Sequence, residues 1–119
     1  MAAPVLLVED DEPIRVSIRE LLEQEGFRVI TAENGRVALD LLGAAVDRPA
    51  LILLDMTMPV MNGGEFPFAR KADFRWRTIP VVILSARSWL HEGVLGVDHV
   101  LNKPADLEKL IPLVKQYCG

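Results

Sequence analysis

Short aliphatic runs alternate with longer amphipathic segments along this chain of 119 residues. The aliphatic runs predict strands, because each is short, apolar and bounded by polar or turn-forming residues. Several lack the apolar–polar alternation of a half-buried strand, so we expect strands that are covered on both faces. The five expected strands span residues 4–9, 27–32, 50–55, 79–86 and 98–103.

Apolar residues at helical spacing predict helices over residues 10–26, 35–45 and 105–117. In the first of these, Pro13 suits an opening turn and Gly26 suits a C-terminal stop. Pro67 is expected to delay, kink or break a further helix within residues 61–78. The apolar stripes consist of Ile14, Ile18, Leu21 and Leu22, then Val37, Leu41 and Leu42, and finally Leu107, Leu110, Ile111 and Val114.

Strand–helix alternation of this kind predicts an α/β fold: an open parallel sheet with helices on both faces and right-handed crossovers. The length suits a single domain that spans residues 1–119. In open parallel sheets, functional sites lie beyond the carboxyl ends of the strands. The residues that follow each expected strand are therefore the first place to look for chemistry.

Composition narrows the classes of partner and compartment. The formal net charge of −4 argues against general attraction to nucleic acid or to an anionic membrane. No apolar run approaches the ~18–20 residues of a membrane span. Cys118 is the single cysteine, so neither an internal disulfide nor a cysteine zinc site is expected. We expect a soluble, cytoplasmic protein with no direct nucleic-acid or membrane partner.

Charged and polar residues gather at four of the expected strand ends. Glu9 and Asp10 end the first strand, Asp55 the third, Ser85 the fourth and Lys103 the fifth. Carboxylates this close repel one another, and a cation would relieve the repulsion. Hard oxygen ligands favour Mg²⁺. The cluster suits phosphoryl transfer, with Asp55 as the nucleophile and with Lys103 and Ser85 contacting the phosphoryl oxygens.

Four segments resemble, in order and spacing, the receiver domain of bacterial response regulators. They are "VLLVEDDEPIR", "LILLDMTMPVMNGGEF", "IPVVILSA" and "VLNKP", and together they span almost the whole chain. The resemblance implies a flavodoxin-like fold with strand order 2-1-3-4-5. It also implies a Mg²⁺-dependent phosphoacceptor, which a histidine kinase or a histidine phosphotransfer protein phosphorylates and which signals to an unknown downstream protein.

The resemblance assigns the metal and acceptor roles position by position. Asp55 is identified as the phosphoacceptor and as a Mg²⁺ ligand, and Asp10 as the direct carboxylate ligand. Glu9 acts on the metal through water, and the backbone carbonyl of Thr57 is a further ligand. Asp11, which follows the acidic pair, suits a helix cap better than a ligand.

The resemblance also assigns the residues that respond to phosphorylation. Ser85 corresponds to the switch hydroxyl, and Lys103 to the lysine that contacts the phosphoryl group. Thr57 and Arg87 occupy positions that tune the rate of dephosphorylation. The second switch position is usually aromatic, and here it is Val100. The segment between Ser85 and Lys103 is also about four residues short, near one helical turn, so we expect a short or irregular fourth helix.

These features leave three functions open. The first is a stand-alone, phosphorylatable receiver, which signals by protein contact and catalyses only its own phosphotransfer and slow autodephosphorylation. The second, motivated by Val100 and the short fourth helix, is a protein-binding module that no longer uses phosphorylation. The third is a phosphatase of the haloacid-dehalogenase type. That type places a second aspartate two residues after the nucleophile, where this chain has Thr57, so the third is disfavoured.

Overall fold

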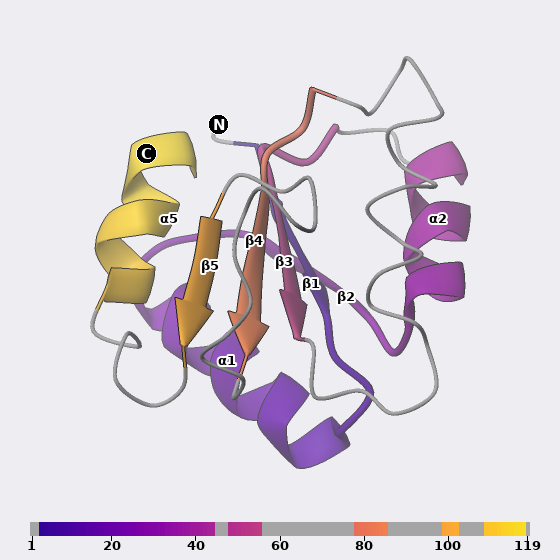
Figure 1. The fold of residues 1–119 in the computed structure, drawn as a ribbon, viewed down its shortest axis with the longest axis horizontal. Helices are drawn as coiled ribbons and strands as arrows, with labels where there is room; N and C mark the ends of the chain where they lie inside the picture. The colour runs from indigo at the N-terminus through magenta and orange to yellow at the C-terminus, as the bar shows by residue number, and fades with distance from the viewer. Residues whose placement is uncertain (1–2, 45–47, 56–77, 86–98, 103–108, 119) are drawn as a thin grey trace.

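The protein folds as a five-stranded parallel sheet with helices on both faces (Figure 1). The structure is a computed structural model, and it describes residues 3–44, 48–55, 78–85, 99–102 and 109–118. The strand order β2-β1-β3-β4-β5 confirms both the expected fold class and the order that the resemblance implied. Each strand lies within two residues of its expected bounds. The elements are β1 Val5–Val8, α1 Glu12–Gln24, β2 Val29–Ala32, α2 Gly35–Ala44, β3 Leu51–Asp55, β4 Val81–Ser85, β5 His99–Asn102 and α5 Leu110–Cys118.

The central strand β3 is buried on both faces, as its continuous apolar sequence predicts. Ile52 and Leu54 belong to a cluster that packs against α2. Leu51 and Leu53 belong to a second cluster, which packs against α1 and α5. Figure 1 shows the same division, with α2 on one side of the sheet and α1 and α5 on the other. The alternation of side chains along each strand thus fills two cores at once.

The start of α1 is fixed by its cap. Asp11 has extended backbone geometry, and its side chain accepts a hydrogen bond of 3.1 Å from the amide of Ile14. Pro13 lies in the first turn, where its missing amide donor costs nothing. The prediction that Asp11 caps this helix is confirmed.

The end of α1 is a Schellman motif. The amide of Phe27 donates to the carbonyl of Leu22 at 3.1 Å, and the amide of Gly26 donates to that of Glu23 at 3.0 Å. Gly26 adopts a φ of +92°, a left-handed conformation that favours glycine. Leu22 and Phe27 both join the core cluster under α1. The sequence signal for a stop at Gly26 is therefore confirmed.

Only part of the apolar stripe on α1 faces the sheet. Leu22 is fully buried and Ile18 is half-buried, whereas Ile14 is 39% and Leu21 44% exposed. The reason is angular: residues on a helix advance by about 100°, so Leu21 points well away from Leu22. A stripe as wide as this one extends past the edge of the sheet that covers it.

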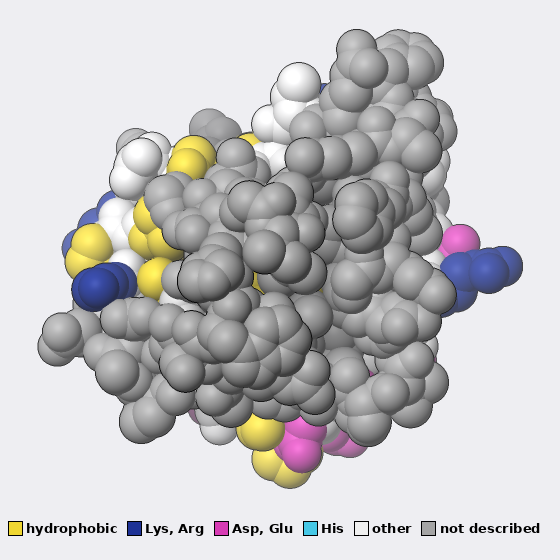
Figure 2. Space-filling model, in the orientation of Figure 1, with side chains coloured by type: hydrophobic (Ala, Val, Ile, Leu, Met, Phe, Trp, Pro, Cys, Tyr) yellow, Lys and Arg dark blue, Asp and Glu magenta, His cyan; other side chains and the backbone are white. Residues whose placement is uncertain are grey.

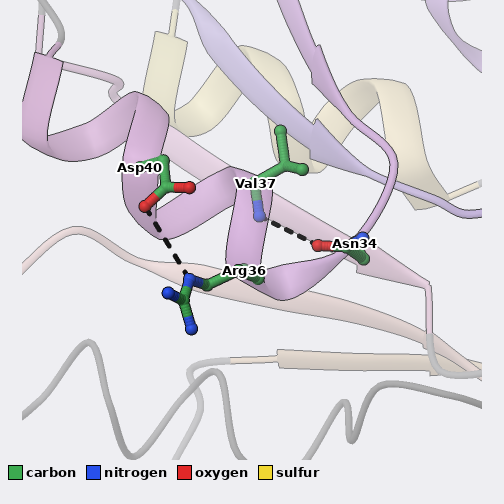
Figure 3. A network of polar contacts seen from close by, with 4 residues as sticks. All are labelled: Asn34, Arg36, Val37 and Asp40. Carbon is green, nitrogen blue, oxygen red and sulfur yellow. Dashed lines mark hydrogen bonds and ion pairs between the residues drawn. The ribbon is translucent and has the colours of Figure 1, made fainter.

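The helix α2 begins with a cap that the sequence analysis did not identify (Figure 3). The Asn34 side-chain oxygen accepts a hydrogen bond of 2.9 Å from the amide of Val37. On the exposed face, Arg36 and Asp40 form an ion pair of 4.0 Å. The inward-facing residues are Ala38 and Leu42, both buried, with Val37 and Leu41 packed beside them; of these, sequence analysis missed Ala38.

The expected third and fourth helices, with Pro67 and the short 87–97 segment, lie outside the described residues, as does the beginning of the last helix. In α5 itself, Leu110 and Val114 are buried and Ile111 packs against them, as expected. None of the helices within the described ranges is long and apolar enough to cross a membrane.

Candidate functional site

The five parallel strands bring their carboxyl ends to one edge of the sheet, and α1 starts at the same edge (Figure 1). Val8 at the end of β1 pairs with Leu54, one residue before Asp55. Glu9 and Asp55 are therefore level with each other on neighbouring strands, which lie about 4.8 Å apart. The expectation that these two positions meet at one sheet edge is confirmed for the backbone.

Asp55 is the last residue of β3, and its backbone pairs with Leu84 on β4. Two buried strands, β1 and β4, flank β3. The apolar residues before Asp55 are held on both faces of the sheet, so the position of its backbone is set by the core. Its side chain lies outside what the structure describes.

Glu9 carries a carboxylate that is fully buried, and it is the sole buried polar or charged residue among those described. Its amide donates to the carbonyl of Ala32 at 2.9 Å, which extends the pairing of β1 with β2. A side-chain oxygen, Oε2, lies 3.5 Å from the amide of Asp11. Burial of a carboxylate is costly unless a cation or hydrogen bonds compensate it. This position therefore favours a positive charge nearby.

Asp10, next in the chain, is exposed to solvent. Asp11 is also exposed, but its side chain is engaged in capping α1. Figure 2 shows acidic and hydrophobic side chains side by side at the lower edge of the view, where Figure 1 draws α1. The positive end of the α1 dipole faces the same segment and partly offsets its charge. Asp10 is thus the member of the acidic run with a free approach from water.

The remaining expected site residues are placed only in part. Ser85 ends β4, and its backbone pairs with Asn102, the residue before Lys103. Val100 lies in β5 and pairs with Ile83. The side chains of Ser85 and Val100 are not described, and the expected roles of Lys103, Thr57 and Arg87 fall on residues outside the described ranges.

The residues present fit a magnesium ion. The fully buried carboxylate of Glu9 stands beside the exposed one of Asp10, and both follow a strand that neighbours the end of β3. Such a set offers hard oxygen ligands and leaves several positions to water, the coordination that Mg²⁺ prefers. Within the ranges described, no group of three or more acidic, histidine or cysteine side chains forms a metal site by itself.

One residue at this edge was missed in the sequence. The Arg15 guanidinium nitrogen Nη1 donates to the backbone carbonyl of Glu9 at 2.9 Å. The sequence does contain a signal for this contact. Arg15 lies seven residues, about two helical turns, before the buried Leu22, so both residues lie on the side of α1 that faces the sheet. An arginine on an apolar face, one turn after an acidic strand end, indicates a polar contact with that end.

Comparison with known proteins agrees with this geometry. The model of the response regulator receiver domain matches residues 5–115. Transcriptional regulatory protein CpxR of Escherichia coli K12 is 39% identical over 115 residues, covering 93% of this chain and 47% of CpxR. The chain spans less than half the length of the first curated relatives that it matches.

Two solved structures share the fold across nearly the whole chain. The chemotaxis protein CheY4 of Vibrio cholerae is 30% identical, with a TM-score of 0.85, and the match covers 98% of this chain and 99% of that one. The response regulator TrrA of Thermotoga maritima, crystallised with Mg²⁺ and BeF, is 26% identical, with a TM-score of 0.82 and coverage of 97% and 98%. The chain therefore belongs to the family of response regulator receiver domains, the signalling modules of two-component systems.

Proposed function

We propose that this chain is a phosphoacceptor receiver, in which Asp55 accepts a phosphoryl group from a histidine kinase or a histidine phosphotransfer protein. The observation that carries the proposal is the register of the sheet. It sets the backbone of Asp55, at the end of a doubly buried strand, level with that of Glu9, whose carboxylate is buried and whose neighbour in the chain, Asp10, is exposed. Family membership supports the same function.

The proposed reaction is a displacement at phosphorus. A carboxylate oxygen of Asp55 attacks the phosphorus atom of the donor. The bond between phosphorus and the donor's nitrogen or oxygen breaks, and its electron pair leaves with the donor. Mg²⁺, when bound, offsets negative charge on the phosphoryl oxygens. Asp10 and the backbone carbonyl of Thr57 are the proposed direct ligands beside Asp55, and Glu9 acts through water.

The proposal gives the other residues supporting roles. Lys103 neutralises the phosphoryl oxygens, and the Ser85 hydroxyl donates a hydrogen bond to one of them. Support comes from the strand ends: Ser85 closes β4, beside the strand end that precedes Lys103. Ser85 and Val100 are the proposed switch positions. Thr57 and Arg87 set the rate of slow autodephosphorylation.

We further propose that residues 1–119 fold as one receiver domain, which signals through contact with a downstream protein in the cytoplasm. Two-component receivers act with histidine kinases, and the exposed acidic edge is where such a donor must deliver its phosphoryl group. The buried free thiol of Cys118 suits a reducing compartment.

The test is incubation with acetyl phosphate and Mg²⁺, followed by mass spectrometry of the intact protein and its peptides. We expect one phosphoryl group on the peptide that contains Asp55, and none when EDTA is added. The Asp55→Asn variant should gain none. A matched control is Asp40→Asn, which removes an exposed carboxylate from α2 and should be phosphorylated like the wild type. Phosphate on another residue, or none on the wild type, would refute the proposal.

A second candidate function is a binding module that works without phosphorylation. Val100 favours it, since valine in β5 cannot make the ring movement of an aromatic switch residue. If Asp55→Ala fully replaces the wild type in cells, this candidate is correct and the phosphoacceptor role is not used. Rapid turnover of a phosphomonoester would instead support the phosphatase, which Thr57 disfavours.

A further inference from the structure

The segment between β1 and α1 is tied to the helix at both ends. The Asp11 side chain accepts from the amide of Ile14 at 3.1 Å, which anchors the helix side. On the strand side, Arg15 Nη1 donates to the carbonyl of Glu9 at 2.9 Å. Asp10 lies between these two contacts and is exposed. The backbone that carries the carboxylates of Glu9 and Asp10 is therefore held on either side of Asp10.

The hydrogen bond from Arg15 is stronger than the contact between Asp11 and the Glu9 side chain. Its 2.9 Å separation and its charged donor are typical of hydrogen bonds about twice as strong as neutral ones. The contact from the amide of Asp11 to Glu9 Oε2 is 3.5 Å long and correspondingly weak. Arg15 is also half-buried, so water competes less for its donors.

The atom that Arg15 holds matters for the site. The carbonyl oxygen of Glu9 belongs to the peptide that joins Glu9 to Asp10. Fixing that peptide sets the directions in which the two successive side chains leave the backbone. Without the guanidinium, the peptide loses the hydrogen bond that restrains its carbonyl.

We propose that Arg15 is a positioning residue for metal binding: it orients the Glu9–Asp10 peptide so that both carboxylates face one cation. The inference rests on the proposed function, because it assumes that these carboxylates bind Mg²⁺. A positioning role and a simple charge effect predict opposite changes in Mg²⁺ affinity when the Arg15 guanidinium is removed. A guanidinium that acted only through its charge would repel Mg²⁺, so its removal would tighten binding.

The test compares Mg²⁺ affinities of Arg15→Met and the wild type, measured from amide chemical shifts of residues 9–12 during titration with MgCl₂. We expect Arg15→Met to bind Mg²⁺ about 10-fold more weakly, the lower end of the range for residues that orient metal ligands. Arg15→Lys keeps a donor that can reach the carbonyl and should recover most of this loss.

A matched control is Arg19→Met on the same helix. Arg19 pairs with Glu23 at 3.7 Å on the surface, so this variant removes the same charge without touching the acidic segment. Its Mg²⁺ affinity should stay within about twofold of the wild type. Unchanged or tighter binding by Arg15→Met, or equal losses in both variants, would overturn the inference alone. No Mg²⁺ binding by the wild type would overturn the proposed function.

A measurement on the wild type covers the case in which Arg15→Met does not fold. The guanidinium Nη–H resonances of Arg15 and Arg19 can be followed as MgCl₂ is added, because Nη1 is the Arg15 atom that donates to Glu9. We expect the Arg15 resonance to be protected from exchange with water and to shift with the same affinity as the amides of residues 9–12. An Arg15 resonance that behaves like that of Arg19 would contradict the positioning role.

Discussion

Glu9 shows how a single residue can join the core to the chemistry. Its backbone continues the pairing of β1 with β2, while its fully buried carboxylate lies at the acidic edge. A purely structural residue at such a position would be apolar, since a buried carboxylate destabilises the fold unless it is compensated. A carboxylate at this buried position is understandable if it helps to bind a cation.

The variant Glu9→Gln separates the contribution of the Glu9 charge to Mg²⁺ binding from its effect on the stability of the fold. It keeps the shape of the side chain and removes the charge, so we expect weaker Mg²⁺ binding by 10-fold or more. In EDTA we expect the free energy of unfolding to rise by about 1 kcal/mol, because one of several neighbouring carboxylates that repel one another is neutralised. Urea unfolding measures the second quantity. Glu20→Gln, on the exposed side of α1, is the control and should change neither. A large loss of stability in Glu9→Gln would contradict this account.

Cys118 makes a pH-dependent contribution to stability. The thiol is 6% exposed in the cluster with Leu110 and Val114, and burial raises its pKa above the ordinary value of 9.0. The folded state thus keeps the proton at pH values where the unfolded state releases it. The contribution is fully present below pH 9.0 and is lost as pH rises through the raised pKa.

The measurement is urea unfolding at pH 8 and pH 10 for the wild type and for Cys118→Ala. Both proteins lose stability from other groups, but we expect the wild type to lose more, because only it deprotonates a buried thiol on unfolding. Alkylation of the folded wild type by iodoacetamide should also be slow compared with alkylation in urea. Equal pH dependence in the two proteins would show that the thiol is accessible in the folded state.

At the scale of elements, α1 is defined by its ends rather than by its apolar stripe. Asp11 and Gly26 satisfy the terminal backbone groups, and both could be recognised in the sequence because capping depends on residue type. The stripe was less informative: Ile14 and Leu21 fit helical spacing yet remain exposed. Periodicity gives the side of a helix that is apolar, but the width of the sheet decides how much of that side is covered.

Gly26 gives a direct test of the C-terminal end of α1. A Cβ atom built on it would meet no heavy atom within 4 Å, so Gly26→Ala introduces no clash. It does force a side chain into the left-handed region at φ +92°, which costs about 1–2 kcal/mol. Gly26→Asn should cost less, because asparagine tolerates this region better. Thermal and urea unfolding of both variants would check the order. A stabilising Gly26→Ala would show that the helix ends differently.

At the scale of the whole molecule, the strands place the chemistry at one edge and supply most of the core, and the helices cover the two faces of the sheet. The fold class and the meeting of Glu9 with Asp55 at one edge followed from short aliphatic runs and their polar ends, whereas the strand order followed from the resemblance to receiver domains. The contact of Arg15 with Glu9 did not, because a long side chain on a helix can reach in several directions. Backbone positions at a sheet edge follow from topology, whereas individual side-chain partners follow from packing.

This arrangement couples metal binding to the stability of the entire domain. A cation that binds the acidic edge binds only the folded state, since the strand ends separate on unfolding. At a Mg²⁺ concentration ten times the dissociation constant, the free energy of unfolding should rise by about 1.4 kcal/mol. Urea unfolding in MgCl₂, compared with KCl of equal ionic strength, measures this rise.

Two variants serve as controls for the site of binding. Asp10→Asn should abolish the stabilisation by Mg²⁺, whereas Asp40→Asn, which removes a carboxylate from the exposed face of α2, should preserve it. Equal stabilisation of both variants would show that Mg²⁺ acts by screening and not at the sheet edge.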